Sequence, residues 1–219
     1  MSVHTVSHGY VNSFVIVGNG VTLIDTGVTG GDQKILEALA DLGKGPRDVH
    51  RIILTHLHAD HAGAAARLKE VTGAPVYMHP VDAQLVRQGI AVRPGFTGVF
   101  PLNGLMSVAQ VVRPGRYRPC EVDHEVVEGD VIEDGFQVVF TPGHSAGHIS
   151  LLREGWLFAG DAATNLLRPG PPFIFEDQAL SRESFQRLAG LEFELAGFGH
   201  GRTIERGASA RFMARFKAV

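Results

Sequence analysis

A cluster of four potential metal ligands constrains this sequence more than any other feature. The four residues are His56, His58, Asp60 and His61. They follow the apolar run 51–54, which predicts a short buried strand, and precede the alanine-rich stretch 62–71, which predicts a helix. We therefore place the cluster on a strand-to-helix loop, where a rigid scaffold lets polar side chains converge on one point.

The spacing inside this cluster suits metal ions. Alternate residues of an extended segment point the same way, so His56 and His58 can bind one ion together. Asp60 and His61 then turn with the chain and can face a second ion. Nitrogen and oxygen ligands without sulfur suit zinc, and also iron or manganese. Because gathering this many polar side chains is costly without a partner, the cluster predicts a metal site.

Three further potential ligands each come just after a predicted strand, and most lie beside glycines that let the backbone approach an ion. They are His144, Asp161 and His200. The strands before them are expected at 137–140, at 156–159 and near 194–197. Their order and placement indicate that they complete the same site.

Strands and helices mix in two similar halves. In the first half we expect strands at 5–6, 10–17, 21–25, 51–54 and 76–78, and helices at 32–42 and 62–71. In the second half we expect strands near 130–132, 137–140, 149–152, 156–159 and 194–197, and helices near 182–188 and 204–216. The pattern predicts an α/β or α+β layered fold with two packed sheets and outer helices. At 219 residues, one domain covering 1–219 is the default.

The segment 83–120 fits neither half. It has no acidic residue but five arginines, and its stretch 94–112 is wholly uncharged. Pro94 and Pro101 interrupt that stretch, which argues against a membrane-spanning helix. We expect an insertion that packs on its own domain, covers the site as a lid, or forms the interface of a homodimer.

Composition excludes several classes. Twenty basic residues against 23 acidic ones give a net charge of −3, which offers no field for binding nucleic acid or anionic lipid. The single cysteine, Cys120, excludes an intrachain disulfide and a zinc site built on several thiolates. The first residues show no basic stretch followed by an apolar run, so we expect no secretory signal and a cytoplasmic protein.

Five segments resemble the metallo-β-lactamase superfamily, including its glyoxalase II-like and lactonase-like hydrolases. They are L-I-D-T-G at 23–27, T-H-L-H-A-D-H at 55–61, T-P-G-H-S-A-G at 141–147, F-A-G-D at 158–161 and G-H-G at 199–201. The resemblance implies the four-layer αβ/βα sandwich of that family, with two packed mixed sheets and metal ions at one edge between them.

The resemblance also implies a role for each ligand. His56, His58 and His144 would hold the first metal, and Asp60, His61 and His200 would hold the second. Asp161 would bridge two divalent ions, most often zinc, with iron or manganese as alternatives. Asp25 would steady a ligand, although a carboxylate at a strand end can also cap a turn.

The activity implied is hydrolysis of an ester, thioester or lactone in a small molecule. A metal-bridging hydroxide would attack the carbonyl carbon, and Asp60 would orient it and pass a proton to the leaving group. Cys-containing β-lactamases place a thiol where Asp161 stands, which argues against β-lactam substrates. Glyoxalase II enzymes carry a helical extension, whereas 18 residues follow Gly201, which puts glutathione thioesters in doubt.

Two other functions stay open from the sequence. Persulfide dioxygenases resemble the chain in the same motifs and use one iron, held by residues that match His56, His144 and Asp161. A metal-binding protein without catalysis is the third class.

The remaining histidines carry less information. His50, His79 and His124 are expected at the surface or in loops. His148 is either near the site or a packing residue at a strand end, and His8 is a weak candidate for the cleft.

Overall fold

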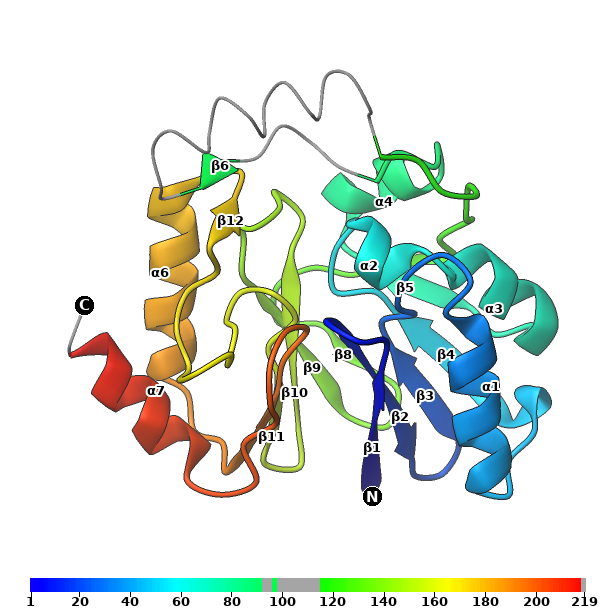
Figure 1. Cartoon of the computed structure of the whole chain (residues 1–219), viewed down its shortest axis with the longest axis horizontal. Coiled ribbons are helices and arrows are strands. Elements are labelled where there is room, and N and C mark those ends of the chain that lie inside the picture. Colours follow the sequence, from blue (N-terminus) through cyan, green and yellow to red (C-terminus); the bar gives the residue numbers. More distant parts are fainter. Residues whose placement is uncertain (92–95, 98–114, 218–219) are drawn as a thin grey trace. The chain divides into compact units, whose positions relative to one another are not determined.

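The computed structural model describes residues 1–91, 96–97 and 115–217 (Figure 1). These residues belong to two compact units, one of Met1–Val92 with Pro114–Val126 and one of Arg93–Arg113 with Val127–Val219. The apolar stretch 94–112 lies outside the described residues except for 96–97. The predicted lid and homodimer interface at 83–120 therefore stay predictions.

The first unit is built on a six-stranded mixed sheet. Its strands are β1 (Ser2–Ser7), β2 (Asn12–Val17), β3 (Val21–Ile24), β4 (Val49–Ile53), β5 (Val76–Met78) and β7 (His124–Glu125). They follow the order β1-β2-β3-β4-β5-β7, antiparallel from β1 to β3 and parallel from β3 onwards. A tight turn joins β2 to β3, and in it the Gly18 N–H donates to the Gly20 carbonyl. Parallel neighbours bring the carboxyl ends of β3, β4 and β5 to one edge.

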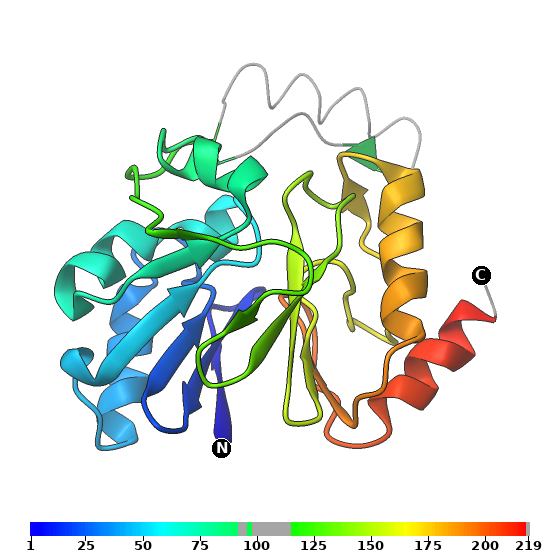
Figure 2. The same cartoon turned by 180° about the vertical axis from the view of Figure 1, so that it is seen from behind.

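Helices cover one face of this sheet. They are α1 (Asp32–Asp41), the 3₁₀ turn η1 (Pro46–Asp48), α2 (Ala59–Ala62), α3 (Ala65–Thr72) and α4 (Pro80–Val86). Figures 1 and 2 both show α1 and α3 lying against the sheet. Ile35 and Leu39 of α1 and Leu68 of α3 are fully buried in one core with strand residues such as Leu23 and Ile52. Burying such side chains stabilises the unit by about 1.5–3 kcal/mol each.

The helix predicted at 62–71 is present from Ala65 as α3, but the chain breaks before it, and Ala62 ends the separate short helix α2. Gly63 lies at the break, and its N–H donates to the Gly27 carbonyl at 3.1 Å. A Cβ at position 63 would lie 2.2 Å from the Ala59 carbonyl and 2.5 Å from the Thr29 nitrogen. The close approach of this loop to the end of β3 therefore overrides the helical preference of the alanines.

The second unit contains a five-stranded sheet and a small two-stranded one. The larger sheet has the order β13 (Leu195–Gly197), β11 (Trp156–Phe158), β10 (Ile149–Arg153), β9 (Phe136–Phe140) and β8 (Val131–Ile132). Only the β13–β11 pair in it is parallel. The smaller sheet pairs β12 (Ile174–Phe175) with β6 (Phe96–Thr97), a short piece of the arginine-bearing insertion.

Two helices, α6 (Gln178–Ala189) and α7 (Ala208–Phe216), pack on the larger sheet (Figures 1 and 2). Phe212 of α7 lies 5.2–5.8 Å from the rings of Phe185, Phe193 and Phe198 and fixes this helix to the core. The helix α6 starts earlier than predicted, because Asp177 caps it by accepting the Leu180 N–H. The helix α7 starts later than predicted, because Ile204 instead pairs with Ala196.

None of the helices in the described part of the chain is both long enough and apolar enough to cross a bilayer.

Candidate metal centre

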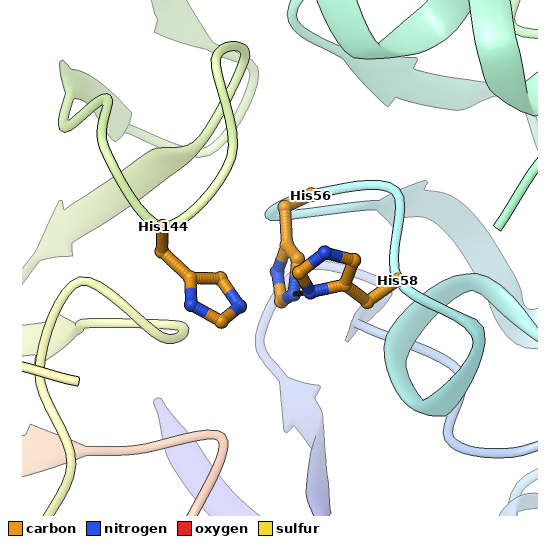
Figure 3. A group of neighbouring side chains, drawn as sticks. All are labelled: His56, His58 and His144. Atoms are coloured by element: carbon orange, nitrogen blue, oxygen red, sulfur yellow. Dashed lines mark hydrogen bonds between the residues drawn. The ribbon is translucent and has the colours of Figure 1, made fainter. Parts of the chain in front are cut away.

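The loop after β4 brings two of the predicted ligands together in the first unit. The His56 Nε2 and the His58 Nδ1 lie 3.1 Å apart, with the rings nearly edge to face (Figure 3). A tetrahedral zinc ion binding nitrogens at about 2.0–2.1 Å separates two of them by roughly 3.3 Å. The two imidazoles therefore have the spacing of ligands to one ion.

Neighbouring groups determine which nitrogen of His56 carries the proton. The Thr55 hydroxyl has one hydrogen, and it donates to the Asp25 carboxylate at 2.8 Å. The His56 Nδ1, 3.0 Å from that hydroxyl, must then be the donor. The lone pair on the His56 Nε2 consequently faces His58, as metal binding requires.

Asp60 and His61 lie in the short helix α2. His61 is fully buried, and its Nδ1 lies 2.8 Å from the Asp25 Oδ2. Ligating histidines commonly donate their other ring N–H to a carboxylate in this way, so Nε2 is the nitrogen that could bind an ion. The ligand atoms of Asp60 and His61 lie within 4.8 Å of each other.

Hydrogen bonds from Asp25 and Thr26, at the end of β3, hold the loop after β4 in place. Asp25 has φ of 57°, a left-handed conformation that Asp and Asn tolerate better than other side chains. Its carboxylate accepts the Thr55 N–H at 2.8 Å, and the Thr26 N–H and hydroxyl both donate to the His61 carbonyl. Asp25 thus positions the candidate ligand His61 and fixes the loop at Thr55, whereas none of these contacts caps a turn of its own.

The second unit brings together the other three predicted ligands. The His144 Nε2 lies 3.4 Å and the His200 Nε2 3.1 Å from the same oxygen, Asp161 Oδ2. Asp161 and His144 are buried at 3% and 5% exposure. One carboxylate oxygen therefore lies as close to two imidazole nitrogens as donor atoms of one metal centre lie to each other. This is the arrangement expected of a bridging ligand.

His144 is oriented by the backbone of β12. Its Nδ1 donates to the Ile174 carbonyl at 2.7 Å, which directs Nε2 toward the Asp161 carboxylate. In the neutral ring this places a lone pair opposite an anionic oxygen, an unfavourable pairing that a cation would relieve. Figure 3 shows His144 on the loop that follows β9.

His148 supports Asp161 and is fully buried. Its Nε2 accepts the Asp161 backbone N–H at 2.9 Å, so its Nδ1 carries the proton and donates to the Thr141 hydroxyl at 2.8 Å. The sequence left a site role and a packing role equally open. The structure makes His148 a residue that positions the loop bearing Asp161.

The other histidines differ in how well the sequence predicted them. His50 and His124 are exposed, as expected. His79 lies in the loop between β5 and α4, as expected, but its side chain is buried and accepts the Val81 N–H. Its burial lowers its pKa, an effect that Asp82 and Glu125 oppose. His8 is half-buried and lies 2.9 Å from the Ser13 hydroxyl; burial, Lys34 and His61 lower its pKa.

Sequence reasoning missed Tyr10. Its side chain is largely exposed, and partial burial together with the nearby Asp60 carboxylate raises its pKa. Tyr10 precedes β2 in a loop with no motif around it, so no sequence signal indicates it.

Each unit thus gathers imidazole nitrogens and carboxylate oxygens at its strand ends, and these histidine and aspartate groups could bind metal. The chain belongs to the metallo-β-lactamase superfamily, whose family model matches residues 6–200. The superfamily is one of metallo-hydrolases, and two relatives of this chain are named probable metallo-hydrolases.

Three relatives illustrate the match. The chain is 37% identical over 145 residues to an uncharacterized protein of Aquifex aeolicus, which covers 64% of this chain and 57% of that protein. It is 32% identical to the probable metallo-hydrolase YflN of Bacillus subtilis, covering 82% and 74%. It is 29% identical to a hydroxyacylglutathione hydrolase of Xanthomonas axonopodis, covering 92% and 64%. The chain thus spans less than two thirds of two of these proteins.

Solved structures show the same fold. The MIM-2 metallo-β-lactamase superposes with a TM-score of 0.77 at 22% identity, over 99% of this chain and 84% of that one. The metallo-β-lactamase of Cronobacter sakazakii gives 0.73 at 24% identity, over 99% and 92%. The predicted α/β fold of the metallo-β-lactamase type is confirmed.

Proposed function

We propose that the protein is a metal-dependent hydrolase that cleaves an ester, thioester or lactone bond in a small molecule. The observation that carries the proposal is the position of the Asp161 Oδ2 between the Nε2 atoms of His144 and His200. The Asp161 carboxylate is buried, and a carboxylate oxygen beside two imidazole nitrogens is a donor set that suits a divalent cation.

In this proposal the predicted ligands would hold two divalent ions. His56, His58 and His144 would hold the first, Asp60, His61 and His200 the second, and Asp161 would be shared by both. The donors are nitrogen and oxygen, and Cys120 is buried against the Glu121 carbonyl, so no thiolate takes part. This donor set suits zinc best, and iron or manganese next.

The metals would lower the pKa of a water molecule and polarise the substrate carbonyl. The chain's own residues would orient the reactants. Asp25 holds His61 and Thr55 holds His56 in the tautomers that leave Nε2 for a metal. The Asp60 carboxylate accepts a proton from the attacking water and returns it to the leaving alkoxide or thiolate.

Two observations support the proposed substrate class: the family of the chain, and the presence of an aspartate and not a cysteine at position 161. Asp161 stands where cysteine-containing β-lactamases have a thiol, which disfavours β-lactams. A relative is named hydroxyacylglutathione hydrolase, which supports a thioester among the candidates. We further propose a small-molecule substrate, no nucleic-acid partner and a cytoplasmic location, since one cysteine in 219 residues suits a reducing compartment.

Metal analysis combined with a hydrolysis screen tests the proposal. We expect about two divalent ions per chain and turnover of at least one compound among lactones, thioesters and aryl esters. Asp60→Asn should lose at least about 100-fold in kcat, whereas Asp41→Asn, an exposed carboxylate at the end of α1, should match the wild type.

Two results would overturn this proposal. One iron per chain with oxygen uptake on a persulfide would assign the dioxygenase function instead. Full metal content with no hydrolysis of any compound, and no effect of Asp60→Asn, would leave a binding protein. The homodimer through 83–120 is a separate proposal, and sedimentation showing only monomer up to high concentration would exclude it.

A further inference from the structure

The second unit has a pocket rich in arginine. Its volume is about 720 Å³, within the size range of small-molecule sites. It is formed by the loop after β11, the segment after His200, and one face of α7. The lining residues are Asn165, Leu166, Leu167, Arg168, Pro169, Arg202, Thr203, Arg211, Ala214 and Arg215.

The charge of this lining has one sign. Four of its residues are arginines, which stay protonated at any physiological pH, and none is acidic. Within the described residues, no carboxylate forms an ion pair with Arg168, Arg202, Arg211 or Arg215. Four guanidinium groups around one hollow repel each other, so the pocket favours an anion.

Helix α7 (red in Figure 1) places two of these arginines on one face. Arg211 and Arg215 are four residues apart, one turn of helix, and Phe212 points from the same helix into the core. Like charges at this spacing destabilise a helix unless an anion lies between them. The Arg215 Nε is buried and has no hydrogen-bond partner among the described residues.

The loop 165–169, which faces α7, lies close to the Arg215 side chain. Thr164 and Gly170 exchange two backbone hydrogen bonds, which close the loop 165–169. A Cβ at position 170 would lie 3.4 Å from the Arg215 Nε, so this guanidinium lies close against the loop. Arg215 is thus partly buried beside this loop, whereas Arg168, Arg202 and Arg211 are exposed.

The pocket adjoins the segment that carries His200. The Asn165 N–H donates to the His200 carbonyl at 2.9 Å, and the Arg202 N–H donates to the Asn165 carbonyl at 3.1 Å. The Asn165 side chain also donates to the Arg202 carbonyl. An anion bound by Arg202 would therefore contact the same short segment as a candidate metal ligand.

We infer that this pocket binds a small molecule with two or more negative charges, carried by phosphate or carboxylate groups. The guanidinium groups of Arg202, Arg211 and Arg215 would hold the charges with paired N–H donors. Leu166 and Leu167, which are 57% and 100% exposed, would contact an apolar part of the same molecule. The inference does not depend on the proposed hydrolase activity.

Calorimetric titration with 1,3,6-naphthalenetrisulfonate tests this inference. Sulfonates are weak metal ligands, so this probe reports the arginine pocket and not the candidate metal centre. We expect one molecule bound per chain, with affinity that falls as salt rises. The double variant Arg211→Gln/Arg215→Gln should weaken binding at least about tenfold.

The matched control is Arg182→Gln/Arg206→Gln, which removes the same charge from exposed positions of the same unit. It should bind the probe as the wild type does, and both variants should keep the wild-type melting temperature within a few degrees. Competition by inorganic pyrophosphate and by tricarballylate then compares phosphate with carboxylate. Absence of probe binding at millimolar concentration, equal weakening by the control, or no competition by either anion would overturn the inference.

Discussion

The Oδ2 of Asp25 lies 2.8 Å from the Nδ1 of His61, and both side chains are almost completely buried. Because Asp25 has φ of 57°, an alanine there would add backbone strain, whereas asparagine tolerates that conformation. Asp25→Asn therefore removes the charge and leaves the backbone unchanged. We expect metal affinity to fall about 10–100-fold, measured by competition with a chelator. Unchanged affinity would show that His61 does not bind a metal.

His148 gives a prediction about stability. Replacing it with phenylalanine keeps a ring and removes both nitrogens, so the Asp161 N–H loses this acceptor and the Thr141 hydroxyl keeps only its contact with the Ser150 hydroxyl. The free energy of unfolding should fall by about 2–4 kcal/mol in urea titrations. His50→Phe, at an exposed position of β4, should change it by less than about 0.5 kcal/mol. Equal effects of the two would contradict the assigned role.

Alanine substitutions at Gly201 and Gly155 distinguish two costs, a clash with nearby backbone and an unfavourable backbone conformation. Both have positive φ, 103° and 78°, but a Cβ at 201 would lie 2.2 Å from the Asn165 backbone whereas that at 155 meets nothing within 4 Å. Gly155→Ala should cost about 1–2 kcal/mol. Gly201→Ala should cost at least about 2 kcal/mol more, measured by chemical denaturation. Similar costs would show that the segment 199–201 moves without penalty.

Asp123 predicts a dependence of stability on pH. Burial alone would raise its pKa, but hydrogen bonds from Lys69 and the Val76 N–H outweigh this and lower it from 3.8. A carboxyl group with a lowered folded-state pKa contributes stability above its unfolded-state pKa and loses it as pH falls through the folded-state value. Asp123→Asn should cost about 1 kcal/mol at pH 7, and the difference from wild type should shrink as pH falls below 3.8 through the lowered folded-state pKa. A difference independent of pH would contradict the charge-based role.

Cys120 should be inert in the native protein. It is 2% exposed, and burial raises its pKa to about 11. At pH 8 the thiolate fraction is then on the order of one in a thousand, far below that of a free thiol. Alkylation by iodoacetamide, followed by mass spectrometry, should be at least about 100-fold slower than for glutathione and should accelerate in urea. Rapid alkylation without denaturant would contradict this environment.

The candidate ligands could be named from the sequence because each follows a predicted strand. A cluster such as His56–His61 after a strand end is visible in the sequence, and the structure places its members together within the first unit. The same is true of Asp161, His144 and His200 in the second unit. Most strand positions followed from apolar alternation.

The groups that position the candidate ligands could not be predicted, because they are backbone N–H and carbonyl groups, which residues of every type carry. The Ile174 carbonyl orients His144 across 30 residues, and nothing about isoleucine indicates this. The break at Gly63 and the late start of α7 likewise come from contacts with distant backbone. The burial of His79 in its loop has no sequence signal either.

The strand β7 comes from the far side of the insertion, and this has a consequence for synthesis. The first unit needs residues up to Val126, since β7 pairs with β5 and the Tyr117 hydroxyl donates to the Leu57 carbonyl in the ligand loop. When only residues 1–92 have left the ribosome, the histidine cluster is already outside it. The pairing of β7 with β5 and the hydrogen bond from Tyr117 cannot yet form. The loop that bears His56 and His58 therefore reaches its final form only after the arginine-rich segment has also emerged.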